Sequence, residues 1–397
     1  MVHRRHGSSS SAVRRAVVVV ALAALLPGCL AGPGGGERSA AAPQGRAPDP
    51  GLRTYEHRAM GTLFRLTLVE RDPDLADRAA AAAFERVDRI EEAATDYSAD
   101  SEARRLPLVS AGEWVEVSHE LGLVMGAADR LVPLSRGAFD PTVGAMTRRW
   151  RRALRQRRWP ESSAWAAASS SLGWAEQVAY EGHGARPRCR IENPELRLDF
   201  GGVAKGVAVD EALAAVEAHG IRSALMDGGG DLRALDPPPG EEGWRVEVLP
   251  FGEKSPRSLR FLLARAAIAT SGDAYQSGVL DGEPLEGLLE AGPGHGAMQY
   301  GHVIDPRSGL PLPSPRAAVM TAATAAEADA LATARLVLGP LATGVVDLER
   351  GLFFGGEDEE PCVGERFPHD GAAPVPSGTS PPGPPWPDAS LQRHRDA

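Results

Sequence analysis

The chain has 397 residues, of which 43% are hydrophobic and 24% are charged, and these ordinary globular values exclude a fully disordered protein. The formal net charge of −10, without an uninterrupted run of lysine or arginine, argues against sequence-independent binding of nucleic acid through its phosphates. The three cysteines, Cys29, Cys189 and Cys362, form no Cys-x-x-Cys or Cys/His cluster, so a structural zinc site is not expected.

The N-terminus has the pattern of an export signal. Arginines without any acidic residue precede an apolar run over 16–26, which is shorter than the roughly 20 residues that span a bilayer. Small residues follow, and Cys29 sits as in the lipobox of bacterial lipoproteins. We therefore predict a lipoprotein-type signal peptide over 1–28 and a lipid on Cys29. The protein would then be exported and anchored to a membrane, facing the periplasm or extracytoplasmic space; an uncleaved membrane anchor is the alternative.

Composition divides the rest of the chain into three parts. Residues 29–53 are rich in glycine, proline and alanine, which is typical of a flexible tether. Residues 355–397 combine acidic residues with proline and glycine, and we predict a disordered tail there. The segment 54–354 between them is long enough to bury a large core, and we predict that it forms a single catalytic unit.

Strand and helix patterns are mixed within this unit. Phe64, Leu66 and Leu68 alternate along 62–69 and predict a strand. Apolar spacing and capping residues predict helices over 75–95, from a Ser118 cap to Leu134, from Gly202 to His219, and over about 326–338. Short strands are expected at 222–227, 244–249, 257–263, 266–271, 302–304 and 317–323. Because strands and helices do not alternate regularly, we predict an α+β fold with mixed or antiparallel sheets and packed helices.

One polar segment, residues 198–206, indicates a phosphate site. We expect a strand to end at Asp199, followed by two glycines and a helix that begins near Lys205. Backbone N–H groups at a helix start attract anions, and glycine lets a phosphate approach the backbone. The spacing matches neither a Rossmann nor a Walker motif. The alternative is an ordinary turn with a solvent-facing lysine.

Two further groups carry chemistry of their own. Asp329 and Thr333 are four residues apart on a predicted helix and share one face, and their oxygen ligands suit Mg²⁺; a solvated helix face is the alternative. His302 could act as a general base near neutral pH, although a lone histidine can also be structural. Neither a Gly-x-Ser-x-Gly elbow nor a zincin motif is present.

Taken in order, eight segments resemble the ApbE family, the FAD:protein FMN transferases, over roughly residues 54–350. They are Met60-Gly61-Thr62, Tyr97–Glu102, Phe139–Gly144, Asp199–Gly206, Gly228–Gly230, Thr270–Asp273, His302–Gly309 and Ala328–Thr333. The resemblance implies a Mg²⁺-dependent enzyme that transfers the FMN moiety of FAD to a Thr or Ser hydroxyl and releases AMP. The acceptor would be an exported or membrane redox protein. An FAD pyrophosphatase that yields FMN and AMP, and a non-catalytic flavin-binding lipoprotein, are the alternatives.

The resemblance also implies site residues. Contacts to FAD are expected from Met60, Tyr97, Ala138, Phe139, Asp140, Asp199, Lys205 and Ile304. Metal ligands are expected at Gly202 (through its carbonyl), Asp329, Ala332 and Thr333. We assign the base that activates the acceptor hydroxyl to His302. Outside these motifs, arginines crowd residues 148–158; we predict a solvated helical face there, with contact to an acidic partner or to lipid headgroups as the alternative.

Overall fold

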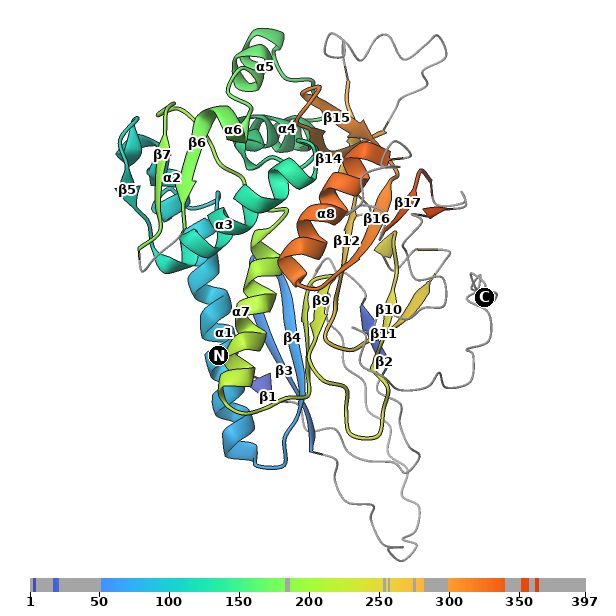
Figure 1. The fold of residues 1–397 in the computed structure, drawn as a ribbon. Coiled ribbons are helices and arrows are strands. Elements are labelled where there is room, and N and C mark those ends of the chain that lie inside the picture. Colours follow the sequence, from blue (N-terminus) through green and yellow to red (C-terminus); the bar gives the residue numbers. More distant parts are fainter. Residues whose placement is uncertain are drawn as a thin grey trace, which may run out of the picture.

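A nine-stranded sheet runs through the centre of the molecule (Figure 1). The computed structural model describes residues 3–4, 17–20, 51–182, 186–252, 255, 258–273, 276–281, 299–339, 351–356 and 361–363. All neighbouring strands of the central sheet are antiparallel. In spatial order they are β1 (His3–Arg4), β3 (Leu52–Ala59), β4 (Thr62–Val69), β8 (Ala224–Gly228), β9 (Asp231–Ala234), β12 (Ala267–Gly272), β16 (Ala317–Ala322), β17 (Gly351–Phe354) and β18 (Cys362–Val363).

Three smaller sheets flank the central one, each with three strands. Their strands, again in spatial order, are β11 (Leu259–Leu263), β10 (Trp244–Val248) and β2 (Val17–Val20); β13 (Ser277–Val279), β14 (Gln299–Asp305) and β15 (Leu310–Pro313); and β5 (Val115–Glu116), β7 (Arg188–Ile191) and β6 (Val178–Glu181). Only the β10–β2 pair is parallel among the described strands. The predicted α+β class with largely antiparallel sheets is confirmed.

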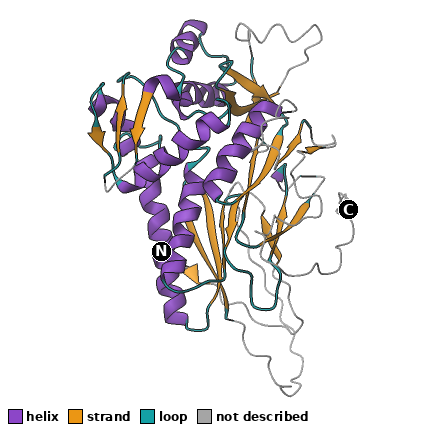
Figure 2. Ribbon diagram, viewed as in Figure 1, coloured by secondary structure: helices purple, strands orange, loops and turns teal. Residues whose placement is uncertain are grey.

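Helices cover one face of the central sheet, and β10 and β11 cover the other (Figure 2). The helices are α1 (Pro73–Ala94), α2 (Glu102–Ser110), α3 (His119–Leu134), α4 (Gly144–Gln156), α5 (Ser162–Ser169), α6 (Trp174–Gln177), α7 (Ala204–Ala218) and α8 (Ala325–Leu338), with a 3₁₀ turn at Pro141–Val143. Buried alanines on α1, such as Ala79 and Ala83, let it pack closely against α7. The two layers place the N-terminal end of α7 and the middle of α8 beside β9 and β12.

The predicted elements match the structure except at one place that matters for the site. Ser118 caps α3 as expected, because its Oγ accepts from the N–H of Leu121 at 3.1 Å. The expected strand that ends at Asp199 is wrong: the segment between β7 and α7 is irregular. The N–H of Asp199 donates to the carbonyl of Pro141 at 2.8 Å, so this backbone pairs with a loop and not with a strand.

The predicted terminal segments are mostly outside the described residues. Of the signal peptide over 1–28 the structure describes only the backbone of β1 and β2, and of the tether over 29–53 only 51–53. Of the tail over 355–397 it describes 355, 356 and 361–363. Among the residues described, no helix is both long enough and apolar enough to cross a membrane.

Candidate active site

The first motif forms a hairpin turn that lies against the glycine run. Met60 (φ 49°) and Gly61 (φ 71°) connect β3 to β4 in a two-residue turn with both φ angles positive. A Cβ on Gly229 would lie only 2.3 Å from Thr62 Oγ1, and Gly229 itself has φ 74°. Glycine is therefore required where these two segments meet. Met60 is half-buried and packs against the main core.

Lys205, in the first turn of α7, pairs with two carboxylates. Its Nζ forms an ion pair with Asp231 at the start of β9 and lies 3.3 Å from Asp329 Oδ2 on α8. The side chains of Asp231 and Asp329 are only 2% and 4% exposed. The N–H of Gly206 also donates to Asp329 Oδ2, at 3.2 Å. We call Lys205, Asp231 and Asp329 the lysine triad; it replaces the solvent-facing lysine of the alternative interpretation.

The charges of the lysine triad do not balance, because two carboxylates share one ammonium group. Burial, together with repulsion from Asp329, raises the pKa of Asp231 to about 7. Burial also raises the pKa of Asp329, against the opposing effect of Lys205. Burial by itself would lower the pKa of Lys205, but the two carboxylates raise it above its usual value. The triad therefore keeps its ammonium charged and can accept one further positive charge.

The residues beside the triad fit a magnesium ion. Thr333 lies one turn after Asp329 on α8, and its Oγ1 is 3.1 Å from Ser271 Oγ on β12. A Cβ on Gly202 would lie 3.0 Å from Thr333 Oγ1, so only a residue without a side chain leaves this hydroxyl open. Carboxylate and hydroxyl oxygens are the ligands that Mg²⁺ prefers.

Two observations limit the number of ligands that the protein itself could provide to such a metal ion. Ala332 is fully buried in α8, and its side chain has no ligand atom. Within the described part of the chain, no group of three or more His, Cys, Asp or Glu side chains is placed to hold a metal ion. A magnesium ion here would need hydroxyl, carbonyl, water or substrate oxygens in addition to Asp329.

A second triad is formed by Asp96, Arg151 and Asp199. The sequence analysis singled out Asp199 as a site residue but missed Asp96 and Arg151. Arg151 Nη1 donates to Asp96 Oδ2 at 2.8 Å, and Nη2 donates to Asp199 Oδ2 at 2.9 Å. The guanidinium also lies over the ring of Tyr97, 5.2 Å from its centroid, while 80% of Tyr97 is exposed. We call these three charged residues the arginine triad. Arg151 was predicted to lie on a solvated face; instead it points inward.

Asp199 is held from several sides within this triad. Its Oδ2 also accepts from Thr147 Oγ1 at 2.7 Å, and its Oδ1 accepts from the N–H of Gly201 at 2.9 Å. Burial, followed by repulsion from Asp199, raises the pKa of Asp96, and Arg151 opposes the shift. The signal that could have identified Arg151 is weak: it is one of several arginines of α4, and only its position on the helix distinguishes it.

His302 lies on β14 within the electrostatic reach of Arg151, Asp199 and Lys205. Burial, and then the charge of Arg151, lowers its pKa to about 4. The ring is therefore neutral at pH 7, and it does not titrate near neutrality as an unperturbed histidine would. Its Nδ1 is buried without a protein hydrogen-bond partner among the described residues. A hydrogen bond with the Gln276 backbone acts in the opposite direction and raises the pKa of the ring.

The side chains of the predicted FAD-binding loop stabilise the loop itself, through burial and hydrogen bonds. Ala138 and Phe139 are buried. Asp140 Oδ1 accepts from both the N–H and the Oγ1 of Thr142, at 2.8 and 2.7 Å, and Oδ2 accepts from the N–H of Trp174 at 3.0 Å. The ring of Phe139 would lie 3.3 Å from a Cβ on Gly202, so the loop reaches the metal side of the site.

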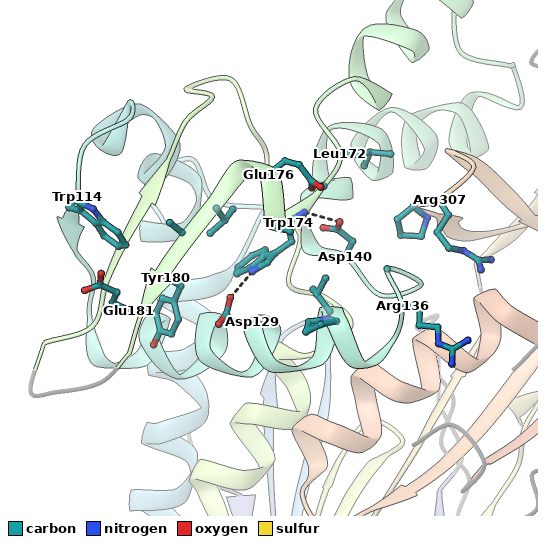
Figure 3. Close-up of a pocket in the computed structure, with 18 residues that line it drawn as sticks. Trp114, Asp129, Arg136, Asp140, Leu172, Trp174, Glu176, Tyr180, Glu181 and Arg307 are labelled. Carbon is teal, nitrogen blue, oxygen red and sulfur yellow. Dashed lines mark hydrogen bonds between the residues drawn. The ribbon is translucent and has the colours of Figure 1, made fainter. Parts of the chain in front are cut away.

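Figure 3 shows an open pocket of about 930 Å³ beside this loop, with Trp174 bonded to Asp140 and, through its indole, to Asp129. Asp140 is the one predicted site residue that lines it; Tyr97, Lys205 and His302 do not. The two triads therefore lie outside this pocket.

Ile304 is placed differently from the other expected FAD contacts. It is buried in a small hydrophobic cluster with Trp150 and Tyr300. The indole of Trp150 donates to the carbonyl of Gly301 at 2.7 Å, which ties α4 to β14. This contact joins the residue before Arg151 to the residue before His302, and so explains how two distant segments present these side chains together.

Comparison with known proteins identifies the family of this chain. A model of the ApbE family matches residues 60–348, which is well over half of the chain. The chain belongs to the ApbE family. The match begins at Met60 and ends after α8, so both triads, His302 and Thr333 fall inside it.

Curated relatives of this ApbE-family chain are named FAD:protein FMN transferase. One from Chlamydia pneumoniae is 28% identical over 230 residues, covering 58% of this chain and 64% of its own length. One from Rhodobacter capsulatus is 30% identical over 234 residues, covering 58% of this chain and 41% of its own length. The chain thus spans less than two thirds of the length of each of these relatives.

A solved structure shares the fold. The apo crystal structure of the Pseudomonas stutzeri flavinyl transferase ApbE superposes with a TM-score of 0.61 and 24% sequence identity. The superposition covers 76% of this chain and 90% of that one. At this level of identity the likeness supports the arrangement of sheets and helices.

Proposed function

We propose that this chain is an FAD:protein FMN transferase, which moves the FMN moiety of FAD onto a protein acceptor. The observation that carries the proposal is the lysine triad: residues from three distant segments meet around the ammonium of Lys205, and Thr333 follows Asp329 by one turn on α8. The family membership and the names of the curated relatives support the same activity.

In this proposal the start of α7 binds the pyrophosphate of FAD through its backbone N–H groups, with Mg²⁺ offsetting the negative charge of the lysine triad. Lys205 lies in its first turn, and no side chain caps the helix. The helix dipole and the N–H groups near Gly202 then favour an anion at this end. Lys205 keeps its proton at neutral pH, because the two carboxylates of the triad raise its pKa. These groups bind and orient the pyrophosphate.

We propose that Mg²⁺ is held by the Asp329 carboxylate, the Thr333 hydroxyl and the Gly202 carbonyl. A bound Mg²⁺ would neutralise negative charge on the pyrophosphate. The excess negative charge of the lysine triad favours a divalent cation at this place. Ala332 contributes only its place in α8, because its side chain has no ligand atom.

In this proposal His302 takes a proton from the acceptor, a Thr or Ser hydroxyl. The acceptor oxygen forms a bond to the phosphorus of the FMN half, the bond between that phosphorus and AMP breaks, and the hydroxyl proton moves to Nδ1 of His302. The ring is neutral and Nδ1 has no protein partner in the described residues, so its lone pair is available.

The cellular setting belongs to the proposal as well. We propose that the enzyme is exported and held at a membrane by a lipid on Cys29, and that its acceptor is an exported or membrane redox protein. The basis is the basic, then apolar, then small-residue pattern before Cys29.

The test is mass spectrometry of an acceptor protein after incubation with this protein, FAD and Mg²⁺. We expect the acceptor to gain one FMN on a Thr or Ser and AMP to appear in equal amount. An acceptor lacking the target hydroxyl, and a reaction with a chelator, serve as controls. FMN and AMP released at the same rate without acceptor would instead identify an FAD pyrophosphatase. Tight FAD binding without any product would identify a flavin-binding protein.

A further inference from the structure

The outer face of α4 carries an unusual charge for this acidic protein. Although the chain has a net charge of −10, Arg148, Arg152 and Arg155 follow one another along one face of the helix and are exposed. None of the ion pairs found within the described residues involves them. Two carboxylates that contact this helix, Asp96 and Asp199, form their ion pairs with Arg151.

Two other segments add to this surface. Arg104 of α2 and Arg197 before α7 are half-buried, and their guanidinium groups also form no ion pair within the described residues. Burial, and then the charges of Arg197 and Arg148, lower the pKa of Arg104, so these three groups lie close enough to repel one another. We call Arg104, Arg148, Arg152, Arg155 and Arg197 the arginine rim.

Arginines elsewhere in the described structure are commonly paired. Arg86 bonds to two glutamates, and Arg188 and Arg233 each bond to one carboxylate. The arginine rim differs from them because unpaired guanidinium groups from three segments lie near one another there. An anionic partner would relieve their mutual repulsion.

The position of the arginine rim favours an acceptor protein over a membrane as its partner. Arg155 acts electrostatically on Tyr97, and Arg104 interacts with Asp96, so the rim borders the arginine triad. Tyr97 is 80% exposed there, which leaves an aromatic surface beside the charges. A membrane pressed on this face would cover the entrance, whereas an acceptor protein must come to it.

We propose that the arginine rim docks an acidic segment of the acceptor protein next to the hydroxyl that receives FMN. This inference rests on the proposed transferase function. Docking through exposed charges raises the rate of encounter and lowers KM for the acceptor, and it weakens with salt because exposed charges are screened. Such contacts are not expected to alter FAD binding or the chemical step.

The test compares the native enzyme with the triple variant Arg148→Gln, Arg152→Gln, Arg155→Gln, using an acceptor with acidic residues near its target threonine. We expect KM for the acceptor to rise about 10-fold at low salt, with kcat and FAD affinity within about twofold. The dependence of KM on salt should largely disappear. A second acceptor, with Asn and Gln in place of the acidic residues, should show the same high KM with both enzymes.

The matched control is Arg78→Gln, an exposed arginine of α1 without an ion pair in the described structure, far along that helix from Asp96. It should leave KM unchanged. If thermal melting shows that the triple variant is unfolded, Arg155→Gln alone should still raise KM measurably.

Three outcomes would overturn docking by the arginine rim. The first is an unchanged KM in a folded triple variant. The second is an equal effect of Arg78→Gln. The third is binding to vesicles of anionic phospholipid that the native protein shows and the triple variant loses, with the same KM for the acceptor in both proteins. That result would assign the rim to a membrane. A native enzyme that transfers no FMN at all would sink the proposed function instead, and acceptor binding measured by fluorescence anisotropy would still test the docking.

Discussion

The lysine triad and the arginine triad use the same arrangement, one cation between two carboxylates, in different surroundings. The carboxylates of the lysine triad are almost fully enclosed, at 2% and 4% exposed. In the arginine triad the side chain of Asp96 is 17% exposed, and the exposed Tyr97 lies beside it. Water therefore screens the carboxylates of the lysine triad less than it screens Asp96, although the Lys205 side chain itself is 28% exposed.

The two cations also differ in what they fix. An ammonium is a compact point charge that can be shared between neighbours, whereas a guanidinium is a rigid fork that sets the direction of each bond. Arg151 directs one nitrogen to each carboxylate, at 2.8 and 2.9 Å. We infer that the lysine triad supplies charge for pyrophosphate and metal, and that the arginine triad positions Asp199 and Tyr97.

The largest expected effect comes from removing a carboxylate of the lysine triad. Asp329→Ala should lower FMN transfer by about 100-fold or more, because the variant loses both the proposed metal ligand and a partner of Lys205. Transfer is measured as acceptor mass gain over a range of Mg²⁺ concentrations. Glu91→Ala, on the distant α1, controls for loss of a carboxylate. Near-native transfer by a folded Asp329→Ala protein would remove the metal site from the proposal.

The arginine triad should respond more moderately. Arg151→Met leaves Asp96 and Asp199 without their shared partner, and we expect FAD to bind about 10-fold to 100-fold more weakly. Arg151→Lys should recover only part of the affinity, because lysine keeps the charge and loses the fork.

The measurement is FAD affinity by fluorescence titration. Arg149→Met is the matched control on the same helix, since Arg149 is exposed and, within the described residues, bonds only to the carbonyl of Ala145. If Arg151→Met bound FAD as tightly as Arg149→Met, Arg151 would have no positioning role.

The lowered pKa of His302 predicts that the stability of the folded protein depends on pH. Its folded-state pKa is about 4, below the ordinary value near 6.5, so the unfolded chain takes up a proton first as the pH falls. This group should therefore lower the free energy of unfolding by about 1–2 kcal/mol between pH 7 and pH 5. Denaturant unfolding at the two pH values gives the native difference, and His302→Gln should reduce it. Identical pH dependence in both proteins would show that the ring titrates normally.

The smallest effect is expected at Gly202. A Cβ there would lie 3.0 Å from Thr333 Oγ1 and 3.3 Å from the ring of Phe139, so the neighbours must shift by a few tenths of an ångström. We expect Gly202→Ala to weaken Mg²⁺ activation about 3-fold to 10-fold. Gly278→Ala is the control, because its Cβ would make an ordinary 3.5 Å contact with Leu154. Equal Mg²⁺ dependence in the two variants would mean that Gly202 does not border the metal.

Some of the elements that the sequence did not predict are very short. Helix α6 and strands β5 and β13 have four residues or fewer, too few for an apolar period to stand out. Longer elements, such as β3 with eight residues and α2 with nine, were not predicted either. The irregular segment before α7 looked like a strand because Leu196 and Leu198 alternate with polar residues. In the structure its backbone bonds to Pro141 instead of to a sheet.

By itself, the sequence determined the α+β class, the bounds of the long helices, and the features that lie within one short segment: the pairing of Asp329 with Thr333 on one helix face, and Lys205 at a helix start. Contiguous residues encode these through helical and strand periodicity. Only the tertiary structure decided which distant groups meet. Arg151 contacts partners 55 and 48 residues away, and Lys205 contacts one 124 residues away. Such contacts, and the low pKa of a buried His302, depend on how the layers pack and on the water they exclude, which no local pattern contains.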